Sequence, residues 1–198
     1  AILHLRFNHP TLGLLLFRTR GDAEAILAHD AVLHEAQGDW FADELRWLRA
    51  RVLRRVDNTS RSLFALIDEK SAFVGTLFEL AQACDRQYMF EDDDGEVVIH
   101  LTEASRGLYP MSTGKTRLQT RFIGDRQALE DALAAEDPLT GPDAVDLGLV
   151  TMALDDIDWE DEVRIAIEER ASLSPDALTG MEQNLRFVGA ENCETKIY

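Results

Sequence analysis

The sequence predicts an α/β fold on the basis of three observations. Short apolar runs of strand length alternate with longer segments that have the 3.6-residue period of a helix. Turn and capping residues separate these segments. The 45% hydrophobic content is sufficient for a buried core, and the 198 residues contain no internal repeat or low-complexity linker. We therefore expect one globular domain, residues 1–198.

Two strands are predicted at the start of the chain, over Ile2–Phe7 and Leu12–Phe17. Each is a short apolar run, and the turn signal Asn8-His9-Pro10 lies between them. A helix is predicted next, over Ala23–Leu33. Asp22 directly precedes this helix and is suited to be its N-cap.

A second helix is predicted over Trp40–Val56, where large apolar residues follow the helical period. We assign its apolar positions to a buried face and its arginines to the outer face. The apolar positions are Phe41, Leu45, Leu48, Val52 and Val56, and the arginines are Arg46, Arg49, Arg51, Arg54 and Arg55. We interpret the arginine-rich face as a solvated face or as a set of pairs with nearby acids, and less often as a contact for an anionic ligand or partner. Of possible partners, we expect an acidic protein surface rather than nucleic acid.

The rest of the chain continues the alternation. Strands are predicted over Ser62–Ile67, Arg86–Phe90, Val97–Leu101 and Val150–Ala153, and the acidic residues 91–95 are interpreted as a hairpin-like turn. Helices are predicted over Val74–Cys84, Thr116–Phe122, Arg126–Ala135, Glu160–Arg170 and Pro175–Phe187. The last helix has a clear start signal, because Ser174 is a good N-cap and proline suits the first helical position.

Charge and cysteine content exclude several classes of protein. With 37 acidic and 20 basic residues the formal net charge is −17, which argues against nucleic-acid binding. No apolar run approaches the roughly 18 residues that a membrane span needs. Two cysteines, Cys84 and Cys193, make no disulfide framework, which favours a reducing cytoplasm. The five histidines show no metal-ligand spacing, so no metal site is expected.

Residues 112–116 resemble the end of a phosphate-binding P-loop, Ser-Thr-Gly-Lys-Thr. The position of the first glycine that this motif requires is occupied by Tyr109. We therefore reject a nucleotide triphosphatase.

Two regions contain candidate catalytic groups. A backbone N–H at Thr76 would lie at the start of a predicted helix, where it can stabilise a developing oxyanion. Glu79 lies three residues later, so Thr76 and Glu79 also fit a capping box, and this segment by itself favours capping. Glu103 follows the predicted strand Val97–Leu101, where a carboxylate is well placed for a cleft. Two carboxylates in one pocket can act as acid and base.

The segment Glu79–Asp85, Glu-Leu-Ala-Gln-Ala-Cys-Asp, resembles the Glu-Leu-Ala…Cys-Asp segment of the crotonase (enoyl-CoA hydratase/isomerase) superfamily. Thr102-Glu103, with Gly107–Pro110 after it, resembles the region of that superfamily's second glutamate. Residues 19–31 align without gaps with its first oxyanion segment. Further strings resemble a branch that opens the ring of aromatic acyl-CoA thioesters: Thr19–Ala23, Ser60–Ile67, Asp155–Trp159, Ser174–Gly180, Asn184–Phe187 and Glu194-Thr195.

The resemblance implies a crotonase-like (ClpP/crotonase) spiral of ββα units over residues 1–153 and a helical tail over residues 154–198. It also implies that the chain is a fragment of a longer enzyme with two crotonase-like halves. The expected substrate is an aromatic acyl-CoA epoxide or dihydrodiol, whose ring is opened by water with release of formate and an aldehyde-bearing acyl-CoA. The expected partners are the chain's own N-terminal half and further copies in a homo-oligomer. No metal or redox cofactor is implied.

For the site, the resemblance implies that Glu79 and Glu103 transfer protons and that the backbone N–H groups of Thr76 and His29 hold the thioester oxygen. Two departures oppose this assignment. The glycine-rich oxyanion loop of the superfamily is Gly75-Thr76-Leu77 here, and Ala28-His29-Asp30 replaces the usual Gly-x-Asp. Side chains at these positions can crowd a thioester. A catalytic half, a non-catalytic supporting half and a generic enoyl-CoA hydratase therefore all stay open.

Overall fold

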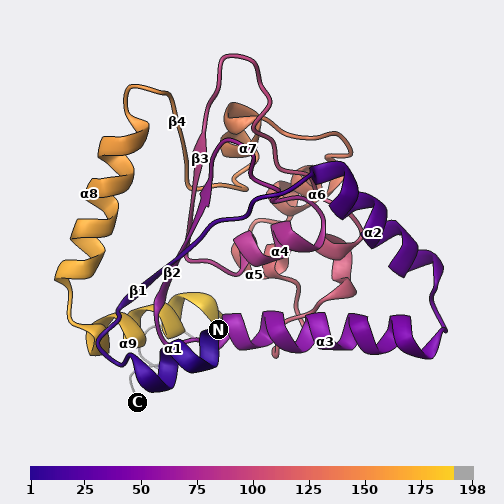
Figure 1. The fold of residues 1–198 in the computed structure, drawn as a ribbon, viewed down its shortest axis with the longest axis horizontal. Coiled ribbons are helices and arrows are strands. Elements are labelled where there is room, and N and C mark those ends of the chain that lie inside the picture. The colour runs from indigo at the N-terminus through magenta and orange to yellow at the C-terminus, as the bar shows by residue number, and fades with distance from the viewer. Residues whose placement is uncertain (190–198) are drawn as a thin grey trace.

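A computed structural model describes residues 1–189 of the chain. Its centre is a sheet of four parallel strands in the order β1-β2-β3-β4 (Figure 1). The strands span Leu14–Phe17, Ser62–Ile67, Arg86–Phe90 and Met152–Leu154. Helical crossovers connect them, as parallel strands require. The predicted α/β class is thus confirmed.

Ten helical segments surround the sheet in the described part of the chain. They are α1 (Ile2–Asn8), α2 (Ala23–Glu35), α3 (Trp40–Asp57), α4 (Thr76–Gln82), the π-helical turn η1 (Ala104–Leu108), α5 (Arg117–Arg121), α6 (Arg126–Ala134), α7 (Gly141–Asp146), α8 (Trp159–Ser172) and α9 (Pro175–Arg186). The sequence had indicated most of them, including α2 with Asp22 as its N-cap. None of the helices within residues 1–189 is long and apolar enough to cross a membrane.

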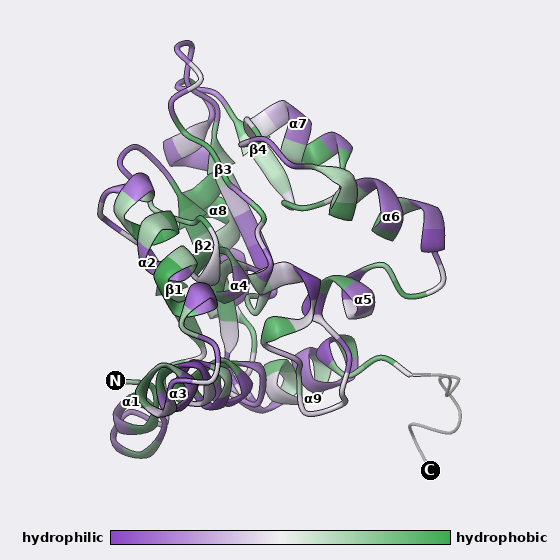
Figure 2. Ribbon diagram, turned by 90° about the vertical axis from the view of Figure 1, so that its right-hand side faces the viewer, coloured by the Kyte–Doolittle hydropathy of each residue, from purple (hydrophilic) through white to green (hydrophobic). Residues whose placement is uncertain are grey.

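Strand β2 is buried on both faces, which is typical of a parallel sheet between helical layers. Alternate residues point to opposite faces. Leu63, Ala65 and Ile67 join the main core with α4, whereas Phe64 and Leu66 pack toward α8. In Figure 2 the hydrophobic colour is prominent around β1 and β2. After β4 the described chain is helical, in α8 and α9.

Two predicted strands are wrong. Residues 2–8 form helix α1, because an apolar run of this length fits either structure and β1 alone fills the place beside β2. Val97–Leu101 is not a strand of the sheet and forms no hairpin with β3. Both edges of β3 are already bonded, to β2 and to β4, and Ile99 makes only an isolated bridge to Leu139.

The predicted orientation of α3 is also wrong. Phe41, Leu48 and Val52 are exposed, although Val56 is buried as expected. The buried face instead contains Ala42, Ala50 and Leu53, and small alanines allow the helix to approach its neighbours closely. Two arginines of the predicted outer face lie on this inner side. Arg46 donates to the Leu33 carbonyl and the Asp43 carboxylate, and Arg49 contacts Asp30.

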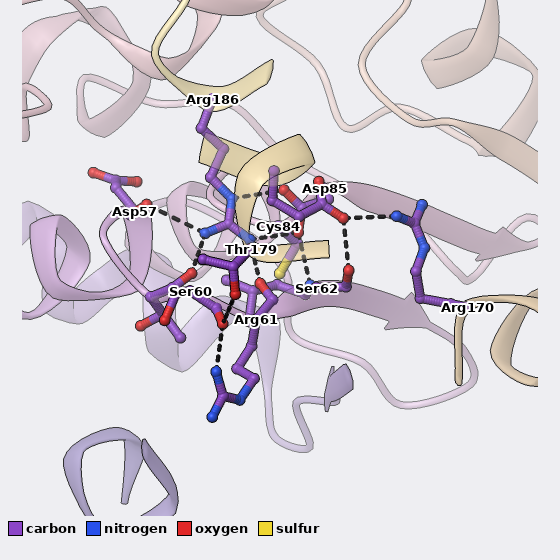
Figure 3. A network of polar contacts seen from close by, with 12 residues as sticks. Asp57, Ser60, Arg61, Ser62, Cys84, Asp85, Arg170, Thr179 and Arg186 are labelled. Atoms are coloured by element: carbon purple, nitrogen blue, oxygen red, sulfur yellow. Dashed lines mark hydrogen bonds and ion pairs between the residues drawn. The ribbon is translucent and has the colours of Figure 1, made fainter. Parts of the chain in front are cut away.

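A polar network fastens α9 to the beginning of β2 (Figure 3). The guanidinium of Arg186 makes two hydrogen bonds of 2.6 Å to the Asp85 carboxylate. The same carboxylate accepts a 2.7 Å hydrogen bond from the Leu63 N–H. Arg186 further donates to the carbonyls of Arg61 and Thr59. Asp85, the last residue of the Glu-Leu-Ala…Cys-Asp segment, therefore has a structural role, because it holds the C-terminal helix on the sheet.

Cys84 lies beside this network and is buried. Burial raises the pKa of its thiol, and the neighbouring Asp85 raises it further. Because the thiolate is the reactive form, we expect labelling of Cys84 by a thiol reagent to be about 100-fold or more slower in the folded than in the urea-unfolded protein. The Cys193→Ser variant makes Cys84 the single reporter; Cys193 and the Glu194-Thr195 string lie outside the described residues. Rapid labelling of the folded variant would contradict this prediction.

Candidate active site

A carboxylate lies at the N-terminal end of α4, where the sequence had suggested an oxyanion-binding N–H. Asp30, from α2, accepts a 2.7 Å hydrogen bond from the Thr76 N–H through its Oδ2 atom. The capping-box interpretation of Thr76 and Glu79 is wrong. Gly75 is the N-cap of α4, no side chain of the helix caps it, and Asp30 supplies the acceptor from 46 residues earlier.

Gly75 allows this close approach. A Cβ atom at position 75 would lie 2.5 Å from Asp30 Oδ2, well inside van der Waals contact. The residue also has a φ of +51°, a conformation that side chains rarely adopt.

Arg49 holds the Asp30 carboxylate in place. Its Nη1 atom donates to Asp30 Oδ1 at 2.6 Å and to Thr76 Oγ1 at 3.1 Å, and lies 3.5 Å from the Tyr109 hydroxyl. Its Nη2 atom lies 2.7 Å from His29 Nδ1. One guanidinium of α3 therefore joins α2, α4 and the segment around Tyr109. Charge-assisted hydrogen bonds of this kind are stronger than neutral ones.

His29 is the seventh residue of α2. A backbone N–H at such a position ordinarily donates to the carbonyl four residues earlier in the helix. Its ring contacts Arg49 instead of lining a thioester site. His29 and Thr76 both contact the guanidinium of Arg49, and this shared contact is what links them.

A cavity of about 340 Å³ lies next to Thr76, between α2 and η1. Its walls are mainly apolar and include Leu27, Leu33 and Leu108, and Thr76, Asp30, His100 and Glu103 add polar groups. This volume is within the range of about 300–1,000 Å³ of small-molecule sites. Within residues 1–189, no group of three or more His, Cys, Asp or Glu side chains is arranged to hold a metal ion.

Glu103 is at the mouth of this cavity. It immediately precedes η1, its side chain is 64% exposed, and its carboxylate lies 3.6 Å from Arg106. The structure therefore brings Glu103 and Thr76 to one cavity. Glu103 does not follow a strand of the sheet, contrary to the prediction, because residues 97–101 make isolated bridges only.

Glu79 is not in an equivalent position. It is 1% exposed, and its Oε2 atom accepts a 2.8 Å hydrogen bond from Arg117. Arg117 also donates to both carboxylate oxygens of Asp57, at 3.0 and 2.7 Å, and to the Tyr109 carbonyl at 2.9 Å. Glu79 Oε1 is buried and has no hydrogen-bond partner among the described residues.

The buried guanidinium of Arg117 thus forms ion pairs with two buried carboxylates, those of Glu79 and Asp57. Burial raises the pKa of Glu79, and the charge and hydrogen bond of Arg117 act against that rise. Burial likewise raises the pKa of Asp57, again opposed by Arg117. The arrangement is suited to fixing α4, α5 and the end of α3 relative to one another, because each element supplies one member.

Comparisons with known proteins show which sequences and folds the chain resembles. No protein-family model matches the chain. Over its whole length the chain is 46% identical to benzoyl-CoA-dihydrodiol lyase of Aromatoleum evansii, of which it covers 36%. Crystal structures of enoyl-CoA hydratase/isomerase proteins from Cupriavidus metallidurans and Hyphomonas neptunium match 99% of the chain, with TM-scores of 0.67 at 16% and 17% identity. These matches cover 71% and 74% of the two solved chains.

The chain has a crotonase-like fold, and its sequence is similar to that of benzoyl-CoA-dihydrodiol lyase over its whole length. Both the resemblance and the crotonase-like fold class that the sequence suggested are confirmed. The chain spans about a third of the length of the Aromatoleum lyase and about half of the length of a probable enoyl-CoA hydratase of Bacillus subtilis, to which it is 29% identical over 132 residues. The catalytic roles of Glu79 and Glu103 and the oxyanion roles of Thr76 and His29 stay predictions.

Sequence reasoning missed three residues that organise this site: Arg49, Arg117 and Asp57. Arg49 belongs to an arginine-rich helix face that the sequence predicts to be on the outside, so its role between α2 and α4 was not foreseen. Arg117 lies between Thr116 and the apolar Leu118 at a helix start. That position was the only local indication that its side chain is buried. Nothing local marks an arginine whose acidic partners are 38 and 60 residues away.

Proposed function

We propose that this chain is part of a lyase that opens the ring of an aromatic acyl-CoA dihydrodiol or epoxide with water, releasing formate and an aldehyde-bearing acyl-CoA. We further propose that this crotonase unit supports the enzyme and does not itself carry out carbon–carbon cleavage. The 46% identity to a benzoyl-CoA-dihydrodiol lyase supports the first part. The expectation that the reaction uses no metal or redox cofactor stays a prediction.

The hydrogen bond from the Thr76 N–H to Asp30 carries the proposal of a supporting role. An oxyanion hole stabilises negative charge that develops on a carbonyl oxygen, and its donors must be directed at that oxygen. Here a carboxylate already accepts from the N–H, and Arg49 fixes that carboxylate. A negative charge at this point opposes the charge that a thioester would develop.

The surroundings of Glu79 support the same conclusion. A general acid or base must come within hydrogen-bond reach of the proton that it transfers. Glu79 is buried behind Arg117, while Glu103 is at the solvent-exposed mouth of the cavity. The two carboxylates therefore occupy separate environments, and they do not form an acid–base pair in this structure.

The cavity of about 340 Å³ favours a second candidate function, a catalytic one. Glu103, His100 and Thr76 contribute to its walls, and the remaining lining is apolar enough for an aromatic ring. In this alternative the unit binds the thioester itself. The reaction would then be the ring opening, or a hydration like that named for the Bacillus subtilis relative.

Glu79→Gln and Glu103→Gln, made in the complete enzyme, separate the two candidates. If this unit has a supporting role, kcat for ring opening should change by about twofold or less in both variants. If the unit is catalytic, each variant should lose about 10²-fold or more, the usual scale for losing a general acid or base. Glu130→Gln, at an exposed ion pair of α6, is the matched control. A 10²-fold loss with an unchanged melting temperature contradicts the supporting role.

A further inference from the structure

A second cavity lies on the face of the sheet that is turned away from α4, at the C-terminal end of α8. Its volume is about 390 Å³, within the range of small-molecule sites. Phe64 of β2 and Tyr88 of β3 line it from the sheet, and Ala166 and Arg170 line it from α8. Phe64 and Tyr88 belong to the core cluster that packs against α8, not to the one that contains α4. This cavity, which we call the α8 cavity, is therefore separate from the one beside Thr76.

The two strands form an aromatic floor with a cation at its edge. Residues two apart on a strand point to the same face, so Arg86 and Tyr88 of β3 lie on one face of the sheet. The register of the parallel pair places Phe64 beside Arg86. The rings of Phe64 and Tyr88 pack edge to face, with their centroids 5.5 Å apart. A further aromatic ring can join such a pair with favourable geometry.

Arg170 brings a buried guanidinium to the same cavity. Its side chain is 9% exposed, and its Nη1 atom donates to Glu182 Oε1 at 2.8 Å. Glu182 is itself fixed by a 2.6 Å hydrogen bond from the Ser62 hydroxyl, and Figure 3 shows Arg170 joined to the polar network at its edge. The guanidinium carbon lies 5.6 Å from the centroid of the Phe64 ring. This group is therefore held in place beside the aromatic floor.

Several hydrogen-bond donors of the α8 cavity are unused. A guanidinium has five N–H donors, and within residues 1–189 that of Arg170 donates only to Glu182. Tyr88 is 3% exposed, yet its hydroxyl has no hydrogen-bond partner in the described part of the chain, whereas buried tyrosine hydroxyls usually have one. Arg86 makes no hydrogen bond or ion pair with any described residue. Donors from three side chains thus meet at one partly apolar cavity.

We propose that the α8 cavity binds a small aromatic carboxylate. The ring of the ligand would pack on Phe64 and Tyr88, and its carboxylate would accept hydrogen bonds from Arg170, Arg86 and the Tyr88 hydroxyl. A planar guanidinium matches a carboxylate in shape and can donate two parallel hydrogen bonds to it. Because Glu182 already holds Arg170, little side-chain freedom is lost on binding.

The charges around the cavity favour an anion with a single charge. Glu182 is 1% exposed and balances Arg170, so the unpaired positive charge is that of Arg86. Glu169 also lines the cavity, but it is exposed and can extend into solvent. A phosphate dianion would exceed the charge that Arg86 can balance. The inference does not depend on the proposed function, because the α8 cavity shares no residue with the cavity beside Thr76.

Titration calorimetry of the complete enzyme with sodium benzoate tests the ligand class. Benzoate should bind with a Kd of about 0.1–1 mM, which is attainable for a ligand of this size. Benzamide, which has the ring without the charge, and inorganic phosphate, which has charge without a ring, should each bind at least about tenfold more weakly. If either binds as tightly as benzoate, or if benzoate does not bind at about 10 mM, the proposal is overturned.

Two variants locate the binding event. Arg86→Gln should weaken benzoate binding at least about tenfold, and Tyr88→Phe, which removes only the hydroxyl, about three- to tenfold. Neither changed group has a hydrogen-bond partner among the described residues, so circular dichroism should show both variants folded. Arg164→Gln, on α8 outside the cavity, should bind as the unmodified enzyme does, and Glu169→Gln should bind at least as tightly. Unchanged binding in both Arg86→Gln and Tyr88→Phe places benzoate elsewhere and overturns the proposal.

Discussion

Arg117→Met should lower the free energy of unfolding by about 3–5 kcal/mol, the range observed when a buried ion pair loses one partner. The side chains of Arg117, Asp57 and Glu79 are each 2% exposed, so removing the guanidinium leaves two carboxylates without a counter-charge in the interior. Water cannot solvate them, and they repel each other. Urea denaturation followed by circular dichroism measures the change.

The controls for Arg117→Met test its mechanism. Arg126→Met, which breaks an exposed ion pair with Glu130, should cost less than about 1 kcal/mol. Adding Asp57→Asn and Glu79→Gln to Arg117→Met should recover much of the stability, because neutral amides need no counter-charge. If the triple variant is as unstable as Arg117→Met alone, the loss comes from packing and not from uncompensated charge.

The same group of residues predicts a pH dependence. Burial raises the pKa of Glu79 in the folded state, so the folded protein binds that proton more tightly than the unfolded chain does. The contribution of Glu79 to stability is therefore greatest below its unfolded pKa, about 4.3. It falls as the pH rises through the folded pKa. Glu79→Gln should flatten the stability profile in this window, and an unchanged profile would contradict the assignment.

Gly75→Ala should lower the free energy of unfolding by about 2–4 kcal/mol, because it combines backbone strain with the loss of a helix cap. The φ of +51° disfavours any side chain, and the new Cβ would meet Asp30 Oδ2 at 2.5 Å. Asp30 would have to leave the Thr76 N–H, and Arg49 would lose its carboxylate partner. Thermal unfolding of the variant measures the loss.

Gly180→Ala is the matched control for Gly75→Ala. Gly180 lies within α9, and a Cβ there would meet nothing within 4 Å. Alanine should therefore stabilise the protein by about 0.5–1 kcal/mol, since glycine is unfavourable inside a helix. In an Asp30→Ala background the Gly75→Ala loss should shrink, because the steric clash is gone. Equal effects of the two glycine substitutions would show that the contact with Asp30 is unimportant.

Local signals predicted the local structure well. Asp22 caps α2, β2 spans the predicted Ser62–Ile67, and Pro175 opens α9. The errors concern partners. Residues 2–8 have the composition of a strand, yet they form a helix. The place beside β2 in the sheet is taken by β1, so residues 2–8 have no strand to pair with there. On α3 the predicted burial of Phe41, Leu48 and Val52 was wrong, because alanines, and not the largest apolar residues, allow its close packing.

The candidate site could be predicted only in part, for the same reason. Glu103 and Thr76 do line one cavity, and the resemblance to crotonases located both. What controls their chemistry comes from far along the chain. Asp30 reaches Thr76 across 46 residues, and Arg117 reaches Glu79 across 38. A carboxylate that fills an anion site and an arginine that neutralises a glutamate carry no short-range pattern.

The order of strands in the sheet has a consequence for biosynthesis. Because neighbours in the sheet are also neighbours in sequence, each new strand can add to the edge left by the preceding one as the chain leaves the ribosome. No strand has to insert between two that are already paired. Helix α9 is the exception. Its Arg186 binds Asp85, 101 residues earlier, so the amino end of β2 is completed only when synthesis of the described chain is nearly finished.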